Sequence, residues 1–166
     1  EIIKIASKKK IKNIAYCPER ISQGNSINEL KTLPQVISTY DKFTENEVSK
    51  LFKIISPKII KAQVKEVELM KLFTNSWRYI LFGISNEFFM ISKKFGLNYE
   101  NIRKIMIDDY PRAKNIPTAG FASGPCLHKD TIQLSHYLGD NFLFGNAAKK
   151  INQNITKFIL KEIQKN

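Results

Sequence analysis

The chain has 166 residues, and its 43% hydrophobic and 25% charged residues exclude a disordered protein and allow one domain with an appendage. The formal net charge of +12 favours anionic partners in general, but only residues 7–12 form a dense basic run. Because no nucleic-acid-binding motif or basic-aromatic cluster occurs, we expect a solvated basic surface and no nucleic-acid partner. The most apolar stretch, residues 79–91, is too short to span a bilayer, and no secretory signal opens the chain, so we expect a cytoplasmic protein with no membrane partner.

Cysteine and histidine are too sparse for a disulfide framework or a metal site. The two cysteines, Cys17 and Cys126, lie far apart in the sequence, which favours a reducing compartment. The two histidines are His128 and His136. Cys126 and His128 together provide fewer ligands than a zinc site needs. We therefore expect no metal.

The first third of the chain has the signals of a small α/β region. A short strand is predicted at residues 12–17, where Pro18 ends it, and a second strand at residues 33–39. Residues 44–47, Thr-Glu-Asn-Glu, fit a capping box, which predicts a helix that ends near Ile55. A strand that begins near the chain start has no neighbours of its own, so either it lies at the edge of a sheet or its sheet is missing, and we interpret residues 1–22 as the tail of something larger.

The dominant predicted element is a helix from about residue 62 to residue 95, which Gly96 ends. At 1.5 Å per residue it would be about 45 Å long. One apolar stripe on it consists of Leu69, Leu72, Phe73, Ile80 and Ile84, and further aromatic side chains cover other faces. A helix that is apolar nearly all round is buried on all sides, so we expect a partner subunit or a partner domain.

The last third of the chain is also predicted to be helical, which makes the fold mainly α. A helix is expected at residues 99–107, with Asn98 as its N-cap. Residues 108–128 are rich in Pro and Gly and predict a long loop, and long ordered loops are often functional. Two further helices are expected at residues 129–138 and 146–165.

Two candidate catalytic residues stand where this loop meets a helix. Cys126 lies directly before a predicted helix start, where the helix N-terminus and the nearby Lys129 would favour a nucleophilic thiolate. The alternative for Cys126 is a small buried hydrophobe. Asp130 opens an Asp-x-x-Gln capping box, and capping alone would explain it, although the same place suits a general base.

Three further polar residues are candidates on weaker grounds. Lys71 and Asn75 share one face of the long helix, where they would stabilise an oxyanion, or would be a snorkelling lysine and a satisfied core amide. Glu19 follows the first predicted strand, where open α/β sheets build their sites, although a turn residue fits the same place.

Three segments of the sequence, taken together, resemble the motifs of a known enzyme family. Residues 16–20 read Tyr-Cys-Pro-Glu-Arg, residues 68–75 read Glu-Leu-Met-Lys-Leu-Phe-Thr-Asn, and residues 120–130 read Gly-Phe-Ala-Ser-Gly-Pro-Cys-Leu-His-Lys-Asp. Their order and spacing resemble the UDP-glucose/GDP-mannose dehydrogenase family over nearly the whole chain from Ala15 onward. The segment Pro18-Glu19-Arg20, followed by Gly24-Asn25, more closely resembles the branch that acts on UDP-N-acetylhexosamines than the UDP-glucose branch.

The resemblance implies an NAD-dependent enzyme that oxidises the C6 alcohol of a UDP-sugar to a uronic acid, for the synthesis of polysaccharide precursors. It implies that Cys126 forms a thiohemiacetal and then a thioester, which water cleaves. The other implied catalytic residues are Lys71, Asn75, Asp130 and Glu19. The implied substrate-binding residues are Arg112, which would reach across a dimer, with Gly120, Phe121 and Gly124, and Lys129 would contact the cofactor.

The resemblance also implies a division of the chain. Residues 1–58 would be the C-terminal remnant of an NAD-binding Rossmann domain, and residues 59–144 a helical central domain that forms a homodimer through its long buried helix. Residues 145–166 would be a connecting helix towards a nucleotide-binding domain. No Gly-x-Gly-x-x-Gly fingerprint occurs in the sequence, so we expect this chain alone to be inactive. A non-catalytic helical dimerisation remnant of such an enzyme is the alternative.

Overall fold

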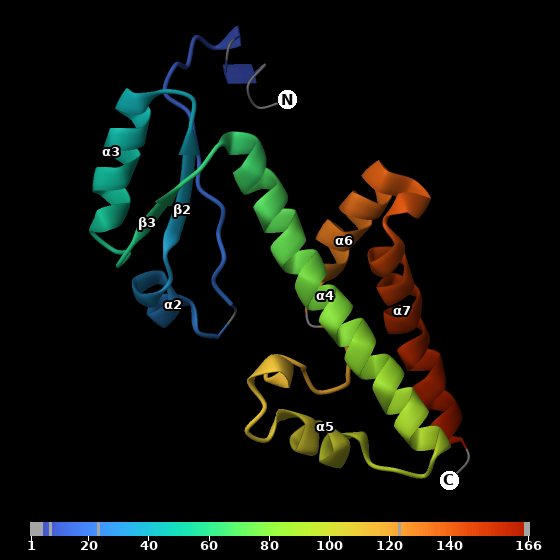
Figure 1. Ribbon diagram of the computed structural model, residues 1–166. Helices are drawn as coiled ribbons and strands as arrows, with labels where there is room; N and C mark the ends of the chain where they lie inside the picture. Colours follow the sequence, from blue (N-terminus) through green and yellow to red (C-terminus); the bar gives the residue numbers. More distant parts are fainter. Residues whose placement is uncertain (1–4, 7, 23, 123, 165–166) are drawn as a thin grey trace. The chain divides into compact units, whose positions relative to one another are not determined.

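The computed structural model describes residues 5–6, 8–22, 24–122 and 124–164, and the chain forms two compact units. Unit 1 is Glu1–Lys71 and unit 2 is Leu72–Asn166. In Figure 1 unit 1 is drawn in blue to green and unit 2 in green to red. Among the described residues, no helix is both long and apolar enough to cross a membrane.

Unit 1 contains a three-stranded sheet with β2 (Gln35–Thr39) in the centre. The strand β1 (Ala15–Tyr16) pairs antiparallel to β2, and β3 (Ile59–Lys61) pairs parallel to it. Residues 36–38 of β2 are buried, as expected for a strand with a neighbour on each side. The two strands predicted from the sequence are therefore confirmed, although both are shorter, and β3 is an addition.

Helix α3 (Lys42–Lys53) begins earlier than its predicted capping box. The N-cap is Asp41, whose carboxylate accepts a hydrogen bond from the backbone N–H of Thr44 at 2.8 Å and another from its hydroxyl at 2.7 Å. Both bonds lower the pKa of Asp41, the backbone bond more than the side-chain bond. The capping box that starts at Thr44 is therefore wrong, because an extended Asp41 one turn upstream takes the cap. The short helix α2 (Ser26–Thr32) was not predicted.

Unit 2 is helical. The long helix α4 (Val64–Lys94) starts in unit 1 and continues into unit 2, and Gly96 follows it with a φ of +67°, as predicted. Helix α5 (Tyr99–Ile107) has the predicted bounds and the predicted cap, because the side chain of Asn98 accepts a hydrogen bond from the N–H of Glu100 at 2.8 Å. Helices α6 (Pro125–Leu138) and α7 (Leu143–Ile163) complete the unit, and in Figure 1 α7 runs beside the C-terminal half of α4.

Helix α6 starts one turn earlier than the sequence predicted. Gly124 is its N-cap with a φ of +76°, and Pro125 occupies the first helical position, where its fixed φ suits the helix and its missing N–H costs nothing. The predicted loop therefore ends at Gly124, and it contains the 3₁₀ helix η1 (Pro111–Ala113). Asp130 lies inside α6 rather than at its start, so the Asp-x-x-Gln capping box is wrong.

The helices of unit 2 pack closely around a small core. Tyr79, Leu127 and Ala148 form its buried centre, so that α4, α6 and α7 each contribute one residue. A methyl group added at Gly83 would stand 3.0 Å from the Cβ of Ala148 and 3.1 Å from its Cα. A side chain at position 83 would therefore force α4 and α7 apart.

Candidate active site

The thiol of Cys126 is exposed in the first turn of α6. Gly124 turns the chain into the helix with a positive φ, and Pro125 fixes the next residue, so the sequence itself places Cys126 at the second helical position. Backbone N–H groups in a first helical turn have no partner within the helix, so they can donate hydrogen bonds to a group beside them. The alternative that Cys126 is a buried hydrophobe is therefore wrong.

A buried carboxylate lies one helical turn after Cys126. Asp130 is four residues further along α6, so the two side chains share a face of the helix. The residue is only 5% exposed, and its Oδ2 accepts a hydrogen bond from Nδ2 of the buried Asn75 at 2.5 Å. Its Oδ1 lies 3.3 Å from Nζ of Lys129, whose side chain is exposed to solvent. The structure thus brings Asn75, Asp130 and Lys129 together within unit 2.

Neighbouring contacts hold α6 against α4 at this point. The hydroxyl of the fully buried Thr131 lies 3.3 Å from the hydroxyl of Ser76 and donates to the carbonyl of Leu127 at 2.8 Å. The rings of Tyr79 and His128 lie 5.8 Å apart in a tilted arrangement. The side chains beside Asp130 are therefore held in place by packing and hydrogen bonds.

The predicted substrate-binding residues lie in the loop before α6 and in η1. Gly120 is half-buried and has a φ of +152°, while Phe121 and Gly124 are exposed; Ser123, in the same motif, lies outside the described residues. Arg112 is exposed, and its guanidinium group lies 4.6 Å from the ring centroid of Tyr110 while Nε donates to the phenol oxygen at 2.9 Å. The structure thus gives Arg112 a stacked, solvent-facing position.

Unit 1 brings the other two predicted residues together. Nζ of Lys71 donates a hydrogen bond to the backbone carbonyl of Glu19. The carboxylate of Glu19 accepts from the backbone N–H groups of Arg20 and Ile21, which is how a turn residue behaves. Cys17 is half-buried nearby in the sequence, and burial raises the pKa of its thiol. The predicted approach of Lys71 to Cys126 joins residues of different units and stays a prediction.

Sequence reasoning missed Asn86, a fully buried polar residue of α4. Its side chain forms hydrogen bonds with both the N–H and the carbonyl of Gly120. One signal was available, because an amide in the most apolar stretch of a chain needs partners when it is buried. Those partners are 34 residues away, so no local pattern identifies them.

The chain is similar in sequence to known dehydrogenases. The chain is 26% identical to the UDP-N-acetyl-D-mannosamine dehydrogenase of Methanocaldococcus jannaschii over 99% of its own length and 38% of that protein. It is 30% identical to the enzyme of the same name from Escherichia coli K12 over 71% of its length and 28% of that protein. The chain therefore spans less than two-fifths of the length of these relatives.

Solved structures agree with the sequence comparison. The UDP-D-ManNAc dehydrogenase structure from Pyrococcus horikoshii superposes with a TM-score of 0.83 at 25% identity, over 91% of this chain and 36% of that one. A UDP-glucose dehydrogenase from Pyrobaculum islandicum shares the fold, with a TM-score of 0.84 at 18% identity, over 99% of this chain and 40% of that one. Residues 65–154, more than half of the chain, match the description "UDP-glucose/GDP-mannose dehydrogenase family, central domain". The chain, with its Cys126 and Asp130 on one helix, belongs to the UDP-glucose/GDP-mannose dehydrogenase family.

Proposed function

We propose that this chain is the central part of an NAD-dependent nucleotide-sugar 6-dehydrogenase that oxidises a UDP-N-acetylhexosamine. The observation that carries the proposal is the hydrogen bond between the buried Asn75 and Asp130, one helical turn after the exposed thiol of Cys126. A short hydrogen bond to a buried carboxylate fixes its position, which is what a group that moves protons beside a nucleophile requires. The substrate class is supported by the names of both relatives, which are UDP-N-acetyl-D-mannosamine dehydrogenases.

The proposed reaction uses Cys126 as a covalent nucleophile. Bound NAD would supply the chemistry of hydride acceptance, once for each of two oxidations. The thiolate of Cys126 adds to the carbonyl carbon of the C6 aldehyde, which gives a thiohemiacetal whose oxygen takes a proton. Loss of a hydride and a proton from this adduct leaves a thioester, and water then cleaves the C–S bond, releasing the carboxylate and the free thiol.

The remaining site residues would act around the sulfur. Asp130 would accept or donate the proton of the attacking or leaving group, with Asn75 holding its carboxylate in place. Lys71 would stabilise the oxyanion of the adduct, and Glu19 would assist hydrolysis of the thioester. We assign the ammonium group of Lys129 to the cofactor, because its positive charge faces solvent beside Asp130 and suits a phosphorylated ligand.

The same proposal assigns the loop before α6 to the sugar nucleotide. Gly120 and Gly124 would let the backbone approach the ligand closely, beside the exposed ring of Phe121. Arg112 would contact the substrate of a neighbouring protomer, which its stacked and exposed position on η1 allows.

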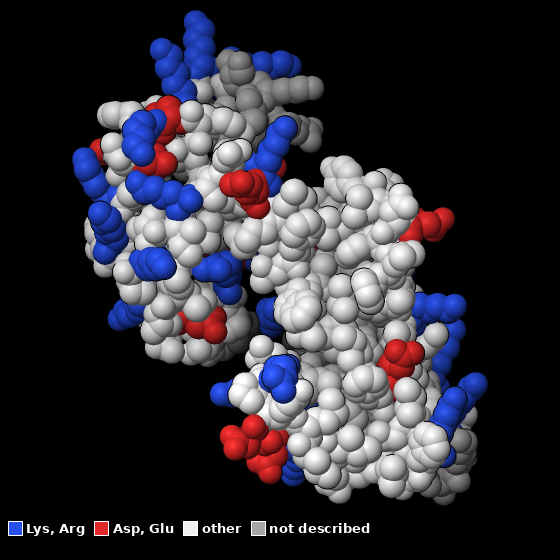
Figure 2. Space-filling model, in the orientation of Figure 1, with Lys and Arg blue, Asp and Glu red and all other residues white. Residues whose placement is uncertain are grey.

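A homodimer through α4 is part of this proposal. One stripe of this helix in unit 2 carries large apolar side chains that the described part of the chain leaves exposed: Phe73, Trp77, Ile84, Phe88 and Ile91. On the face drawn in Figure 2, Lys and Arg gather over unit 1, whereas the surface of unit 2 is mostly uncharged. An uncharged, apolar surface of this kind is typical of the interior of an interface.

The division of the chain into residues 1–58, 59–144 and 145–166 is also proposed, with the first part completing an NAD-binding domain. Residues 165–166 of the last part lie outside the described residues.

The test is NADH formation by the complete protein that contains this chain, with four substrates: UDP-N-acetylmannosamine, UDP-N-acetylglucosamine, UDP-glucose and GDP-mannose. We expect oxidation of one of the two N-acetylhexosamines, with two NADH per sugar, and no turnover by residues 1–166 alone. In the C126A variant the full oxidation should be lost. An unchanged C126A enzyme would exclude the covalent mechanism, and a complete protein inactive on all four sugars would favour the remnant.

A further inference from the structure

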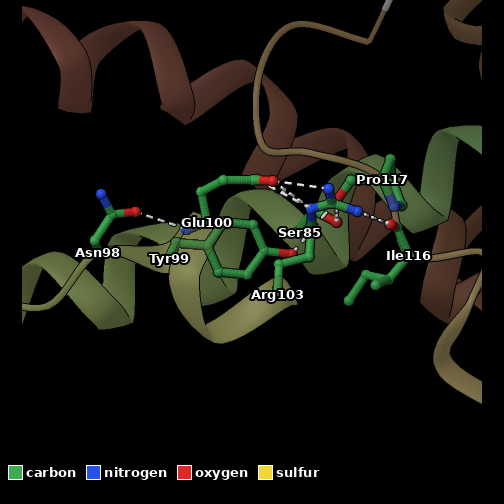
Figure 3. Close-up of polar contacts among 7 residues, drawn as sticks. All are labelled: Ser85, Asn98, Tyr99, Glu100, Arg103, Ile116 and Pro117. Atoms are coloured by element: carbon green, nitrogen blue, oxygen red, sulfur yellow. Dashed lines mark hydrogen bonds and ion pairs between the residues drawn. The ribbon is translucent and has the colours of Figure 1, made fainter. Parts of the chain in front are cut away.

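The segment that leads into the cysteine loop is held by side chains of α4 and α5. Figure 3 shows Ser85 and Tyr99 directed at the same carbonyl, that of Pro117, with donor–acceptor distances of 2.8 and 3.5 Å. Nη1 of Arg103 donates to the carbonyl of Ile116 at 3.3 Å, and an ion pair with Glu100 at 2.7 Å holds the guanidinium group. Three side chains therefore fix two consecutive carbonyl groups of this segment.

The next attachment, at Gly120, has a different geometry because one side chain pairs with both polar backbone groups of one residue. Oδ1 of Asn86 accepts from the N–H of Gly120 at 2.8 Å, and Nδ2 donates to its carbonyl at 2.9 Å. This is the exchange of two hydrogen bonds that one residue of a β-strand makes with its partner. The φ of +152° at Gly120 is accessible to glycine, so the backbone conformation and the pairing amide are matched.

A second amide forms a further hydrogen bond with the first, in addition to the two bonds to Gly120 that already orient it. Nδ2 of Asn86 also donates to Oδ1 of Asn152 on α7 at 2.9 Å, and Nδ2 of Asn152 donates to the carbonyl of Tyr79 at 3.1 Å. Exchanging the oxygen and nitrogen of Asn86 would break its bonds to Gly120 and to Asn152 together. Asn86 is fully buried, so water does not replace these bonds.

We propose that Asn86 is a positioning residue, which sets the backbone of the cysteine loop at Gly120 so that Gly120 and Phe121 hold the sugar nucleotide in register with Cys126. The proposal rests on the proposed function for its substrate, and on the structure for its geometry. The side chain of Asn86 forms hydrogen bonds with Gly120 and Asn152, so it acts through the backbone of Gly120, six residues before Cys126 (126 − 120).

If Asn86 had a purely structural role, its loss would have the same effect on Gly120 as the loss of Asn152, so an Asn152 variant is the matched control. Both N86A and N152A remove a polar side chain between α4 and α7, so both should lower the stability of the unit. Only N86A removes the two bonds to Gly120. N86D keeps an acceptor for the N–H of Gly120, but its second oxygen would face the carbonyl oxygens of Gly120 and Asn152 instead of donating to them, so it should also release the carbonyl of Gly120.

The first measurement is the hydrogen-exchange rate of the Gly120 amide by NMR in residues 1–166. We expect N86A and N86D each to raise this rate at least about tenfold, with less than about a twofold change in N152A. If N86A does not fold, N86D against N152A decides the same question. Equal rates at Gly120 in the Asn86 and Asn152 variants would overturn the proposal.

The second measurement is steady-state kinetics of the complete protein. The KM for the nucleotide sugar should rise more in N86D than in N152A, while the KM for NAD changes equally in both, because only the cysteine loop is displaced. An unchanged KM for the sugar in an active N86D enzyme would also overturn the proposal. A complete protein that oxidises no sugar, but shows the expected exchange at Gly120, would refute the proposed function and leave the loop attachment established.

Discussion

The hydrogen bond between Asn75 and Asp130 allows a quantitative test of the site geometry. The carboxylate is 7% exposed, and Nδ2 of Asn75 lies 2.5 Å from it. Hydrogen bonds to charged groups contribute about 1.5–3 kcal/mol, and a buried charge that loses its partner costs at least as much. We therefore expect N75A to lower the free energy of unfolding by about 2–3 kcal/mol.

Lys129 is unable to compensate for this loss. Its ammonium group lies 3.3 Å from the other carboxylate oxygen, but its side chain is 71% exposed. An ion pair with so exposed a partner contributes about 1 kcal/mol or less, since solvent screens it. The amide of Asn75 is therefore the main group that compensates for burying Asp130.

A double-mutant cycle isolates the interaction. N75A and D130A each leave one buried group without its partner, whereas the double variant leaves neither, so the coupling energy should be about 1.5–3 kcal/mol. Urea unfolding can be followed by the fluorescence of Trp77, which is the chain's single Trp and stands two residues after Asn75 on α4. A cycle of N75A with N146A is the control, because Asn146 bonds to Gly139 instead, and its coupling should stay within about 0.5 kcal/mol. A coupling below about 0.5 kcal/mol for Asn75 and Asp130 would refute the reasoning.

Three further outcomes are expected. Iodoacetamide should label Cys126 faster than Cys17 at neutral pH, because Cys126 is exposed in a first helical turn whereas burial raises the pKa of the Cys17 thiol. Mass spectrometry of tryptic peptides measures both labelling rates, and equal rates would contradict this expectation. G83A should lower the free energy of unfolding by about 1 kcal/mol, because the added methyl group would stand 3.0 Å from Ala148 of α7, which outweighs a gain in helix propensity of about the same size. A G83A variant that is more stable than the parent chain in urea unfolding would disprove the close packing. The pKa of Asp41 is lowered in the folded chain by its bonds to Thr44, so the stability that its carboxylate contributes is complete above the unfolded pKa and is lost as the pH falls through the folded pKa. D41N should flatten this fall in the urea midpoints measured between about pH 2 and pH 5. A pH profile of D41N identical to that of the parent chain would rule out the charged cap.

Local signals in the sequence were sufficient to predict the helices whose ends are determined by neighbouring residues. The bounds of α5 and its cap at Asn98 were predicted correctly, because a cap bonds to a backbone N–H two residues away. The length of α4 and its end before Gly96 followed from an apolar pattern and a residue with a positive φ. The family was also identifiable from the order of three short segments, and residues 65–154 match it.

The tertiary structure alone decided the polar contacts of the site. The pattern of Asp130 and Gln133 fits a capping box, but Gly124 and Pro125 start the helix one turn earlier, and Asp130 bonds instead to Asn75, 55 residues away. A local pattern states what a side chain is able to do, whereas burial decides which partner it finds. For the same reason the attachment of Gly120 by Asn86 was invisible in the sequence, since the two residues meet only after α4 and the cysteine loop have packed together.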